Sequence, residues 1–166
     1  MSLTREAIIK SAKDLYECMK KANQTLATVE SCTGGMVSES MTDLPGVSAV
    51  FLGSVVAYSN NVKSKVLGID PALIAKHGAV SKEVAEAMAS NGRQLLGADV
   101  AVSLTGVAGP DGGSTEKPVG TVWCGIADAH QTLTIKWALS GDRAAIRLAA
   151  AHQALLEVKK FVTRKA

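Results

Sequence analysis

The spacing of apolar residues along the chain predicts that helices and strands alternate. Apolar side chains three and four positions apart, preceded by capping residues such as Thr4 and Ser81, indicate helices with one buried face. The predicted helices cover residues 4–22, 34–43, 62–67, a short segment from 71, 81–97 and 142–162. Runs of apolar and β-branched residues predict strands over residues 26–31, 48–59, 99–107, 121–127 and 132–139.

The order of these elements predicts the fold class. The short connection 128–131 between the last two strands is typical of a β-hairpin. Strands that alternate with helices, followed by a hairpin and a long helix, predict an α/β fold: a three-layer α/β/α sandwich on a mixed sheet, whose antiparallel member comes from the hairpin. With 166 residues, 47% of them apolar, we expect a single domain over residues 1–166.

Composition narrows the partners and the location. The net charge is +3, basic residues cluster only over 159–165 and aromatic residues make up 4%, so no nucleic acid partner is expected. No apolar stretch approaches the ~18–20 residues of a membrane span, and residues 1–10 lack a signal peptide, so we expect no membrane association and a cytoplasmic location. Cys18, Cys32 and Cys124 have no Cys-x-x-Cys spacing, which argues against disulfides and zinc.

One segment has the form in which proteins present a nucleophile. A strand that ends at Ser31 continues into Cys32 and Thr33, and Gly34-Gly35 then open a helix. Glycine lets a ligand approach the backbone closely, and the free N–H groups of a helix start can hold a phosphate or an oxyanion. The segment therefore indicates an enzyme, with a hydroxyl or the thiol as nucleophile.

A serine nucleophile needs a neighbouring base. His77, His130 and His152 have no evident acidic partner and are interpreted as structural or surface residues. Lys63 follows a strand end and is the better candidate, provided that desolvation lowers its pKa from ~10.4 to roughly 7–8. The alternative is an exposed helix lysine. Tyr58 either orients Lys63 or the substrate, or serves in packing.

Two further segments carry candidate binding groups. Residues 105–120 form a loop rich in glycine and proline whose backbone amides can face a ligand. Asp111 and Glu116 in this loop lack a third metal ligand nearby, so no metal is expected. Residues 114–117 match the Ser-x-x-Lys motif of β-lactamases, but the proline that follows prevents the helix this motif needs, so the match is interpreted as chance.

The last predicted helix begins with two arginines, Arg143 and Arg147. Cations in the first turn oppose the helix dipole, and an anionic ligand would explain them. The alternative is that Asp142 caps the helix and pairs with one arginine while the other is solvated.

Four motifs together resemble the C-terminal domain family of the competence-damage protein CinA, and within it the stand-alone PncC type. The resemblance runs from about residue 5 to residue 162, and the motifs occur in the family's order. They are Glu30-Ser31-Cys32-Thr33-Gly34-Gly35, Tyr58-Ser59-Asn60 with Lys63, Thr105-Gly106-Val107-Ala108-Gly109-Pro110-Asp111-Gly112-Gly113, and Ser140-Gly141-Asp142-Arg143.

This resemblance implies an amidohydrolase that converts nicotinamide mononucleotide to nicotinate mononucleotide and ammonia, without metal or other cofactor. The family's serine matches Ser31 and its lysine matches Lys63, with Tyr58 beside them. It also implies a mainly parallel five-stranded sheet with one antiparallel strand, and it is compatible with a homo-oligomer. The substrate-binding residues that we expect are Glu30, Thr33, Gly34, Gly35, Asn60, Thr105, Gly106, Gly109 and Arg143.

Three alternatives stay open at this point. Cys32 is a rival nucleophile, because thiols are intrinsically more reactive than hydroxyls. A nucleotide-binding or partner-binding module without turnover is a rival function. The phosphate of the mononucleotide has two candidate sites, the amides of residues 106–113 and the guanidinium of Arg143.

Overall fold

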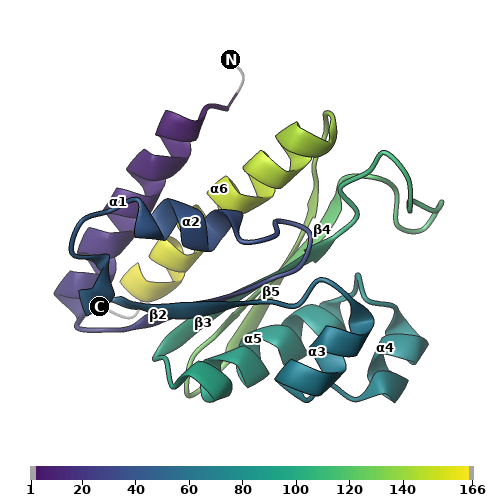
Figure 1. Cartoon of the computed structure of the whole chain (residues 1–166), viewed down its shortest axis with the longest axis horizontal. Coiled ribbons are helices and arrows are strands. Elements are labelled where there is room, and N and C mark those ends of the chain that lie inside the picture. The colour runs from purple at the N-terminus through teal and green to yellow at the C-terminus, as the bar shows by residue number, and fades with distance from the viewer. Residues whose placement is uncertain (1–2, 165–166) are drawn as a thin grey trace.

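The computed structural model describes residues 3–164 and shows a five-stranded sheet between two layers of helices (Figure 1). The strands are β1 (Leu26–Glu30), β2 (Phe51–Val56), β3 (Val100–Gly106), β4 (Thr121–Ala127) and β5 (Thr132–Ala138). The helices are α1 (Arg5–Ala22), α2 (Met36–Thr42), α3 (Asn60–Leu67), α4 (Pro71–His77), α5 (Lys82–Leu96) and α6 (Arg143–Thr163), with a 3-10 turn, η1 (Val47–Ala49), before β2.

The strand order is β2-β1-β3-β4-β5. Strand β1 pairs in parallel with β2 and β3, whereas β4 pairs antiparallel with β3 and β5, and Thr105 lies opposite Trp123 in the β3–β4 register. The predicted mixed sheet of five strands is confirmed, but it is about half parallel and half antiparallel by pairing, not mainly parallel. The reason is that the hairpin joins the sheet through β4, which runs against both of its neighbours.

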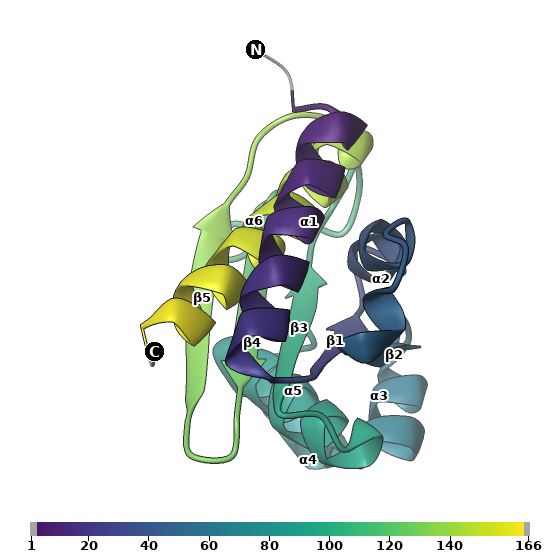
Figure 2. The ribbon, with the colours of Figure 1, turned by 90° about the vertical axis from the view of Figure 1, so that its left-hand side faces the viewer.

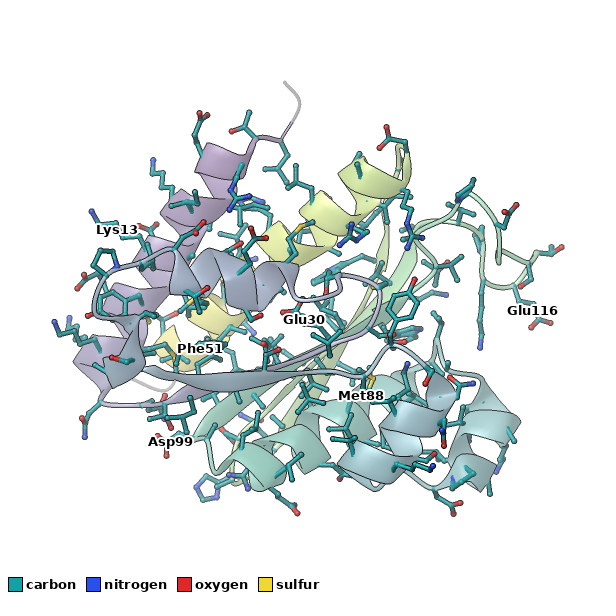
Figure 3. The ribbon with its side chains drawn as sticks, in the orientation of Figure 1. Lys13, Glu30, Phe51, Met88, Asp99 and Glu116 are labelled. Atoms are coloured by element: carbon teal, nitrogen blue, oxygen red, sulfur yellow. The ribbon has the colours of Figure 1, made fainter. Side chains whose placement is uncertain are left out.

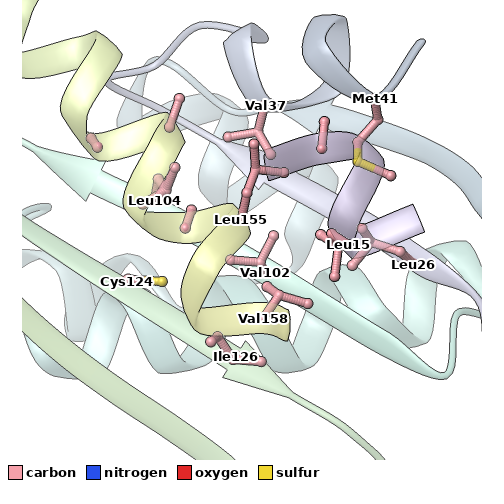
Figure 4. Close-up of a cluster of buried hydrophobic side chains, with 14 of the residues drawn as sticks. Leu15, Leu26, Val37, Met41, Val102, Leu104, Cys124, Ile126, Leu155 and Val158 are labelled. Atoms are coloured by element: carbon pink, nitrogen blue, oxygen red, sulfur yellow. The ribbon is translucent and has the colours of Figure 1, made fainter. Parts of the chain in front are cut away.

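Helices cover both faces of the sheet. Helices α1, α2 and α6 lie on one face and α3, α4 and α5 on the other (Figures 1 and 2). The main core lies between the sheet and the α1/α6 layer, where Leu15, Val102 and Leu155 are at most 2% exposed (Figure 4). Among the described residues, no helix has the length and apolar character needed to cross a membrane.

Local sequence signals place most element ends where they were predicted. The hydroxyls of Thr4 and Ser81 accept the N–H groups of Ala7 and Val84, and so cap α1 and α5. The predicted strand over residues 48–59 is shorter than expected: η1 occupies its start, because the chain turns after Gly46 at a φ of 78°, and the strand proper spans only β2.

Parallel strands bring their carboxyl ends to the same edge of the sheet. The segments after β1, β2 and β3 therefore meet at one end, and they contain Ser31, Tyr58 and the loop that begins at Gly106. The hydroxyl of Ser59 caps α3 by accepting the N–H of Val62 at 3.2 Å. Lys63 thus lies in the first turn of a helix that starts beside the end of β1.

Candidate active site

Ser31 and Lys63 lie in direct contact, although they come from different elements. The Lys63 Nζ atom is 3.0 Å from Ser31 Oγ, and both side chains line a cavity of about 200 Å³ at the carboxyl end of the parallel strands. The N–H of Ser31 donates to the carbonyl of Leu104 on β3 at 2.9 Å, which fixes the backbone that presents the hydroxyl. The structure thus places a hydroxyl and an amine within hydrogen-bond reach, the geometry that a serine nucleophile and its base require.

The amine of Lys63 is buried without a counter-ion. Its side chain is 1% exposed, it donates to the carbonyls of Ala57 at 2.9 Å and Tyr58 at 3.2 Å, and no carboxylate of residues 3–164 lies within 4.0 Å of it. Burial lowers the pKa of this amine from its ordinary value of 10.5, and the neighbouring Cys32 opposes that change. The interpretation of Lys63 as an exposed helix lysine is therefore wrong.

The three contacts of Lys63 favour proton transfer to it. A neutral amine has two N–H donors and one lone pair. The two backbone carbonyls can accept both donors, so the lone pair is left to face the Ser31 hydroxyl. The arrangement is that of a general base poised beside its nucleophile.

Cys32 also lines the cavity, but its thiol is a poor candidate nucleophile. The residue is 5% exposed, and burial raises the pKa of its thiol to about 11. The thiolate is the reactive form of cysteine, and it is scarce at neutral pH when the pKa is raised in this way.

Glu30 does not face the cavity, contrary to what its expected role in substrate binding requires. Its carboxylate is 1% exposed and accepts the N–H groups of Gly35, Val37 and Ser38 at 2.9, 3.2 and 2.8 Å. Figure 3 shows this side chain between α2 and the sheet. The amides that were expected to receive a ligand at the start of α2 are thus bound by the chain itself.

The other residues of this turn have mixed surroundings. The N–H of Gly34 donates to the Ser31 carbonyl at 3.1 Å, and Thr33 is fully buried with no partner for its hydroxyl among the described residues. Thr33, Gly34 and Gly35 are not among the residues that line the cavity. The amides of Cys32 and Thr33 are the two in the turn without an oxygen acceptor in the described part of the chain.

Arg143 and Tyr58 are exposed residues that lie at the mouth of the cavity. Arg143 donates from Nη2 to the Tyr58 hydroxyl at 3.0 Å and from Nη1 to the Gly109 carbonyl at 2.8 Å. The side chain of Tyr58 is 60% exposed, and the contact of Tyr58 with Lys63 is made by the backbone carbonyl. Asp142 caps α6 by accepting the N–H of Ala145, as one of the two alternatives predicted, but no ion pair joins it to an arginine among residues 3–164.

The remaining predicted binding residues divide into two groups. Asn60 and Thr105 line the cavity, and the Thr105 hydroxyl donates to the carbonyl of Ala79 at 2.8 Å. Gly106 lines it as well, whereas Gly109 is not among the lining residues. A Cβ at either glycine would collide with neighbours, 2.7 Å from Val122 Cγ2 in one case and 2.6 Å from Val119 Cγ1 in the other. Both glycines therefore also serve the packing of the loop.

Some residues of the site carry no sequence signal. Ala79, Val80 and Ala108 line the cavity but are small apolar residues that resemble any core position. Arg147 donates to the carbonyls of Cys32 and Thr33 at 3.1 and 2.8 Å, a contact that spans more than a hundred residues of sequence. The unexplained second arginine of α6 was the one hint of this contact.

The histidines considered as bases and the carboxylates considered as metal ligands do not line the cavity. The three histidines are not among its lining residues. Asp111 and Glu116 lie on the exposed part of the loop, and no third metal-ligating side chain joins them within the described residues. Figure 3 shows Glu116 at the tip of this loop.

The geometry defines a class of site: a serine–lysine pair in a cavity at the end of an α/β sandwich. The profile described as CinA C-terminal domain matches residues 8–162. The chain belongs to the CinA C-terminal domain family.

Relatives and solved structures agree with this assignment. A CinA-like protein of Thermotoga maritima is 46% identical over 144 residues, which are 87% of this chain and 35% of that protein, and one of Geobacter sp. (strain M21) is 46% identical over 148 residues, 89% and 36%. The competence/damage inducible protein CihA from Agrobacterium tumefaciens superposes with a TM-score of 0.91 at 34% identity, covering 98% of this chain and 99% of that one. The chain spans about a third of the length of the first two relatives.

Proposed function

We propose that this domain hydrolyses the carboxamide of nicotinamide mononucleotide to nicotinate mononucleotide and ammonia, as its resemblance to the PncC type implies. The observation that carries the proposal is the 3.0 Å contact between Ser31 Oγ and the buried amine of Lys63 in a cavity. A nucleophile with an adjacent base of lowered pKa is the arrangement that amide hydrolysis by acyl transfer requires.

The first half of the reaction forms an acyl-enzyme. Neutral Lys63 removes the proton from Ser31, whose oxygen attacks the carboxamide carbon and gives a tetrahedral oxyanion. The C–N bond then breaks, and the Lys63 ammonium returns the proton to the leaving nitrogen, which departs as ammonia. The amides of Cys32 and Thr33, which have no oxygen acceptor among the described residues, are candidates for stabilising the oxyanion, a contribution on the order of 10²–10³ in rate per donor in known enzymes.

The second half regenerates the enzyme. Water takes the place of ammonia and gives a proton to Lys63, and its oxygen attacks the ester carbon. The bond to Ser31 Oγ breaks, Ser31 regains the proton from Lys63, and the product leaves as a carboxylic acid that loses its proton to solvent. The proton transfers at Ser31, at the leaving nitrogen and at the attacking water all pass through one amine, so the chain needs no second acid or base.

Of the two candidate phosphate sites, Arg143 has the more favourable position. Its guanidinium lines the cavity mouth and its two contacts there, Tyr58 and Gly109, are uncharged. A phosphate at this point would gain a charge-assisted hydrogen bond. The pyridine ring would then lie deeper, toward Ser31 and the apolar lining at Ala79 and Ala108.

Ammonia release from nicotinamide mononucleotide by the purified protein, with chelator present, tests the proposal. We expect release by the wild-type protein and by Cys32→Ala, and loss of at least about 10³-fold in Ser31→Ala. An active Ser31→Ala with an inactive Cys32→Ala would replace the serine mechanism by a thiol mechanism. Binding of the mononucleotide without any release would favour a binding module, and release abolished by chelator would require a metal.

A further inference from the structure

The nucleophile lies on a sharp corner between β1 and α2. Within this corner Gly34 and Gly35 have φ values of +62° and +99°, which L side chains rarely adopt. Glycine adopts such values without strain, so the direction of this corner depends on the contacts that hold it. Two charged side chains, Glu30 and Arg147, flank this corner, and both form hydrogen bonds with its backbone.

Glu30 holds the corner from the side of α2. Its two carboxylate oxygens accept three backbone N–H groups from residues 35–38, at 2.8 to 3.2 Å. No cation of residues 3–164 pairs with this carboxylate, so these backbone dipoles are its main compensation for burial. The start of α2 is thereby fixed relative to the residue that precedes Ser31.

Arg147 holds the same corner from α6. Its Nε donates to the carbonyl of Cys32 and its Nη2 to the carbonyl of Thr33, at 3.1 and 2.8 Å. A Cβ at Gly34 would be 3.4 Å from Nη2, so the guanidinium lies directly against the turn. The fork geometry of arginine fixes both peptide groups at once, which a lysine cannot do.

The two contacts bear directly on the direction of the Ser31 side chain. Successive side chains along a strand point to opposite faces, so Ser31 points toward α3 when Glu30 points toward α2. On the α3 side lies Lys63, whose Nζ is 3.0 Å from the Ser31 oxygen. A rotation of the corner that moved this oxygen 1 Å away from Nζ would break the contact.

We propose that Glu30 and Arg147 are positioning residues that hold the Ser31 oxygen within hydrogen-bond distance of Lys63 Nζ. They act through the backbone of residues 31–38 and touch neither the cavity nor the reacting atoms. Only the kinetic consequence of this inference rests on the proposed amidase function. The geometric consequence stands independently of it.

The test uses Glu30→Gln and Arg147→Lys in the full chain, each checked by thermal unfolding for a folded state. Crystal structures of the variants give the distance between Ser31 Oγ and Lys63 Nζ, which we expect to exceed 3.5 Å. In the ammonia assay, kcat should fall on the order of 10²-fold, the cost of a displacement of about 1 Å, while KM changes by less than about threefold. If Glu30→Gln does not fold, Arg147→Lys carries the test.

Two matched controls remove comparable groups away from the corner. Glu39→Gln removes a carboxylate of α2 that binds Arg5, and Arg93→Lys removes a guanidinium that binds the carbonyl of Ala98. Both should keep the wild-type distance and kcat. Folded Glu30 and Arg147 variants that keep the short Ser31–Lys63 distance would overturn the inference. If the wild-type protein releases no ammonia, the proposed function fails, and the distances alone decide the positioning inference.

Discussion

Arg143 and Tyr58 are joined by a 3.0 Å hydrogen bond across 85 residues of sequence, at the mouth of the cavity that contains Ser31 and Lys63. The bond links the start of α6 to the segment after β2. Tyr58 thus contacts Arg143 through its hydroxyl at the mouth of the cavity and Lys63 through its backbone carbonyl inside.

Tyr58→Phe separates these two roles. The variant loses the bond to Arg143 but keeps the carbonyl that accepts from Lys63. We expect KM for nicotinamide mononucleotide to rise about 2- to 10-fold, as for the loss of a hydrogen bond of about 0.5–1.5 kcal/mol, with kcat nearly unchanged. Steady-state kinetics provide the measurement. A collapse of kcat at constant KM would instead show that the phenol orients the base.

The pH dependence of the reaction should follow the amine of Lys63. Burial lowers the pKa of this amine from 10.5, and only the neutral form can accept the serine proton. We therefore expect kcat/KM to rise with pH through the lowered pKa and then to level off. Lys63→Arg, which stays protonated throughout, should lose activity by at least about 10³-fold at every pH tested. A rate that falls across this range would exclude Lys63 as the base.

The lowered pKa of Lys63 also makes the free energy of unfolding depend on pH. Because the folded-state pKa of Lys63 lies below 10.5, the unfolded chain binds more protons between the two values. The contribution of Lys63 to the free energy of unfolding is therefore least favourable below the folded-state pKa and improves as pH rises toward 10.5. Urea unfolding of the wild-type protein and Lys63→Met at several pH values measures this. The free energy of unfolding of the wild type should increase relative to that of Lys63→Met as pH rises. A difference that stays constant with pH would contradict the lowered pKa of Lys63.

The thiol of Cys32 should be inert in the folded protein. Its pKa is raised to about 11 by burial, and Cys124 is fully buried, whereas Cys18 is partly exposed. With iodoacetamide near pH 8, mass spectrometry should find Cys18 modified first and the other two only after unfolding. Rapid modification of Cys32 in the native protein would return the thiol to consideration as the nucleophile.

Gly125 in β4 should tolerate no side chain. An added Cβ would lie 2.5 Å from the carbonyl oxygen of Ala85 and 2.7 Å from Ser103 Oγ, two atoms that already share a 2.6 Å hydrogen bond. We expect Gly125→Ala to lower the free energy of unfolding by more than about 2 kcal/mol. The control is Gly68→Ala, where no atom of the described residues lies within 4 Å of the added Cβ and only the φ of +65° opposes alanine, at about 1 kcal/mol. Equal losses in denaturant titrations would refute the steric argument.

Local patterns account for what the sequence could predict. The apolar spacing in α1 and the hairpin connection 128–131 are encoded within a few neighbouring residues, and both occur where they were expected. Ser31 and Lys63 could be proposed as partners because each follows a strand, and strands of a parallel sheet end together. The sequence could not show that Lys63 is buried, because its burial depends on how α3 packs beside Ser31, a residue 32 positions away in the chain.

Long-range contacts account for what the sequence could not predict. Glu30 was expected to bind substrate because it belongs to a motif shared with the family, and a carboxylate beside a glycine turn has the same local appearance whether it faces a cavity or a helix end. The strand register decides between the two, and it turns Glu30 toward α2. Arg147 reaches the Cys32 carbonyl only through the packing of α6 against the sheet, a relationship that no local spacing records.

The register that sets Thr105 opposite Trp123 supplies an optical probe of the cavity. Opposite residues on antiparallel strands have Cβ atoms about 4.5–5.5 Å apart, so the indole of Trp123 adjoins a residue of the cavity wall. The other tryptophan, Trp137, pairs with Val122 and therefore belongs to the opposite face of the sheet. With Trp137 replaced by Phe, the fluorescence of a single native indole can follow the filling of the cavity without any attached dye.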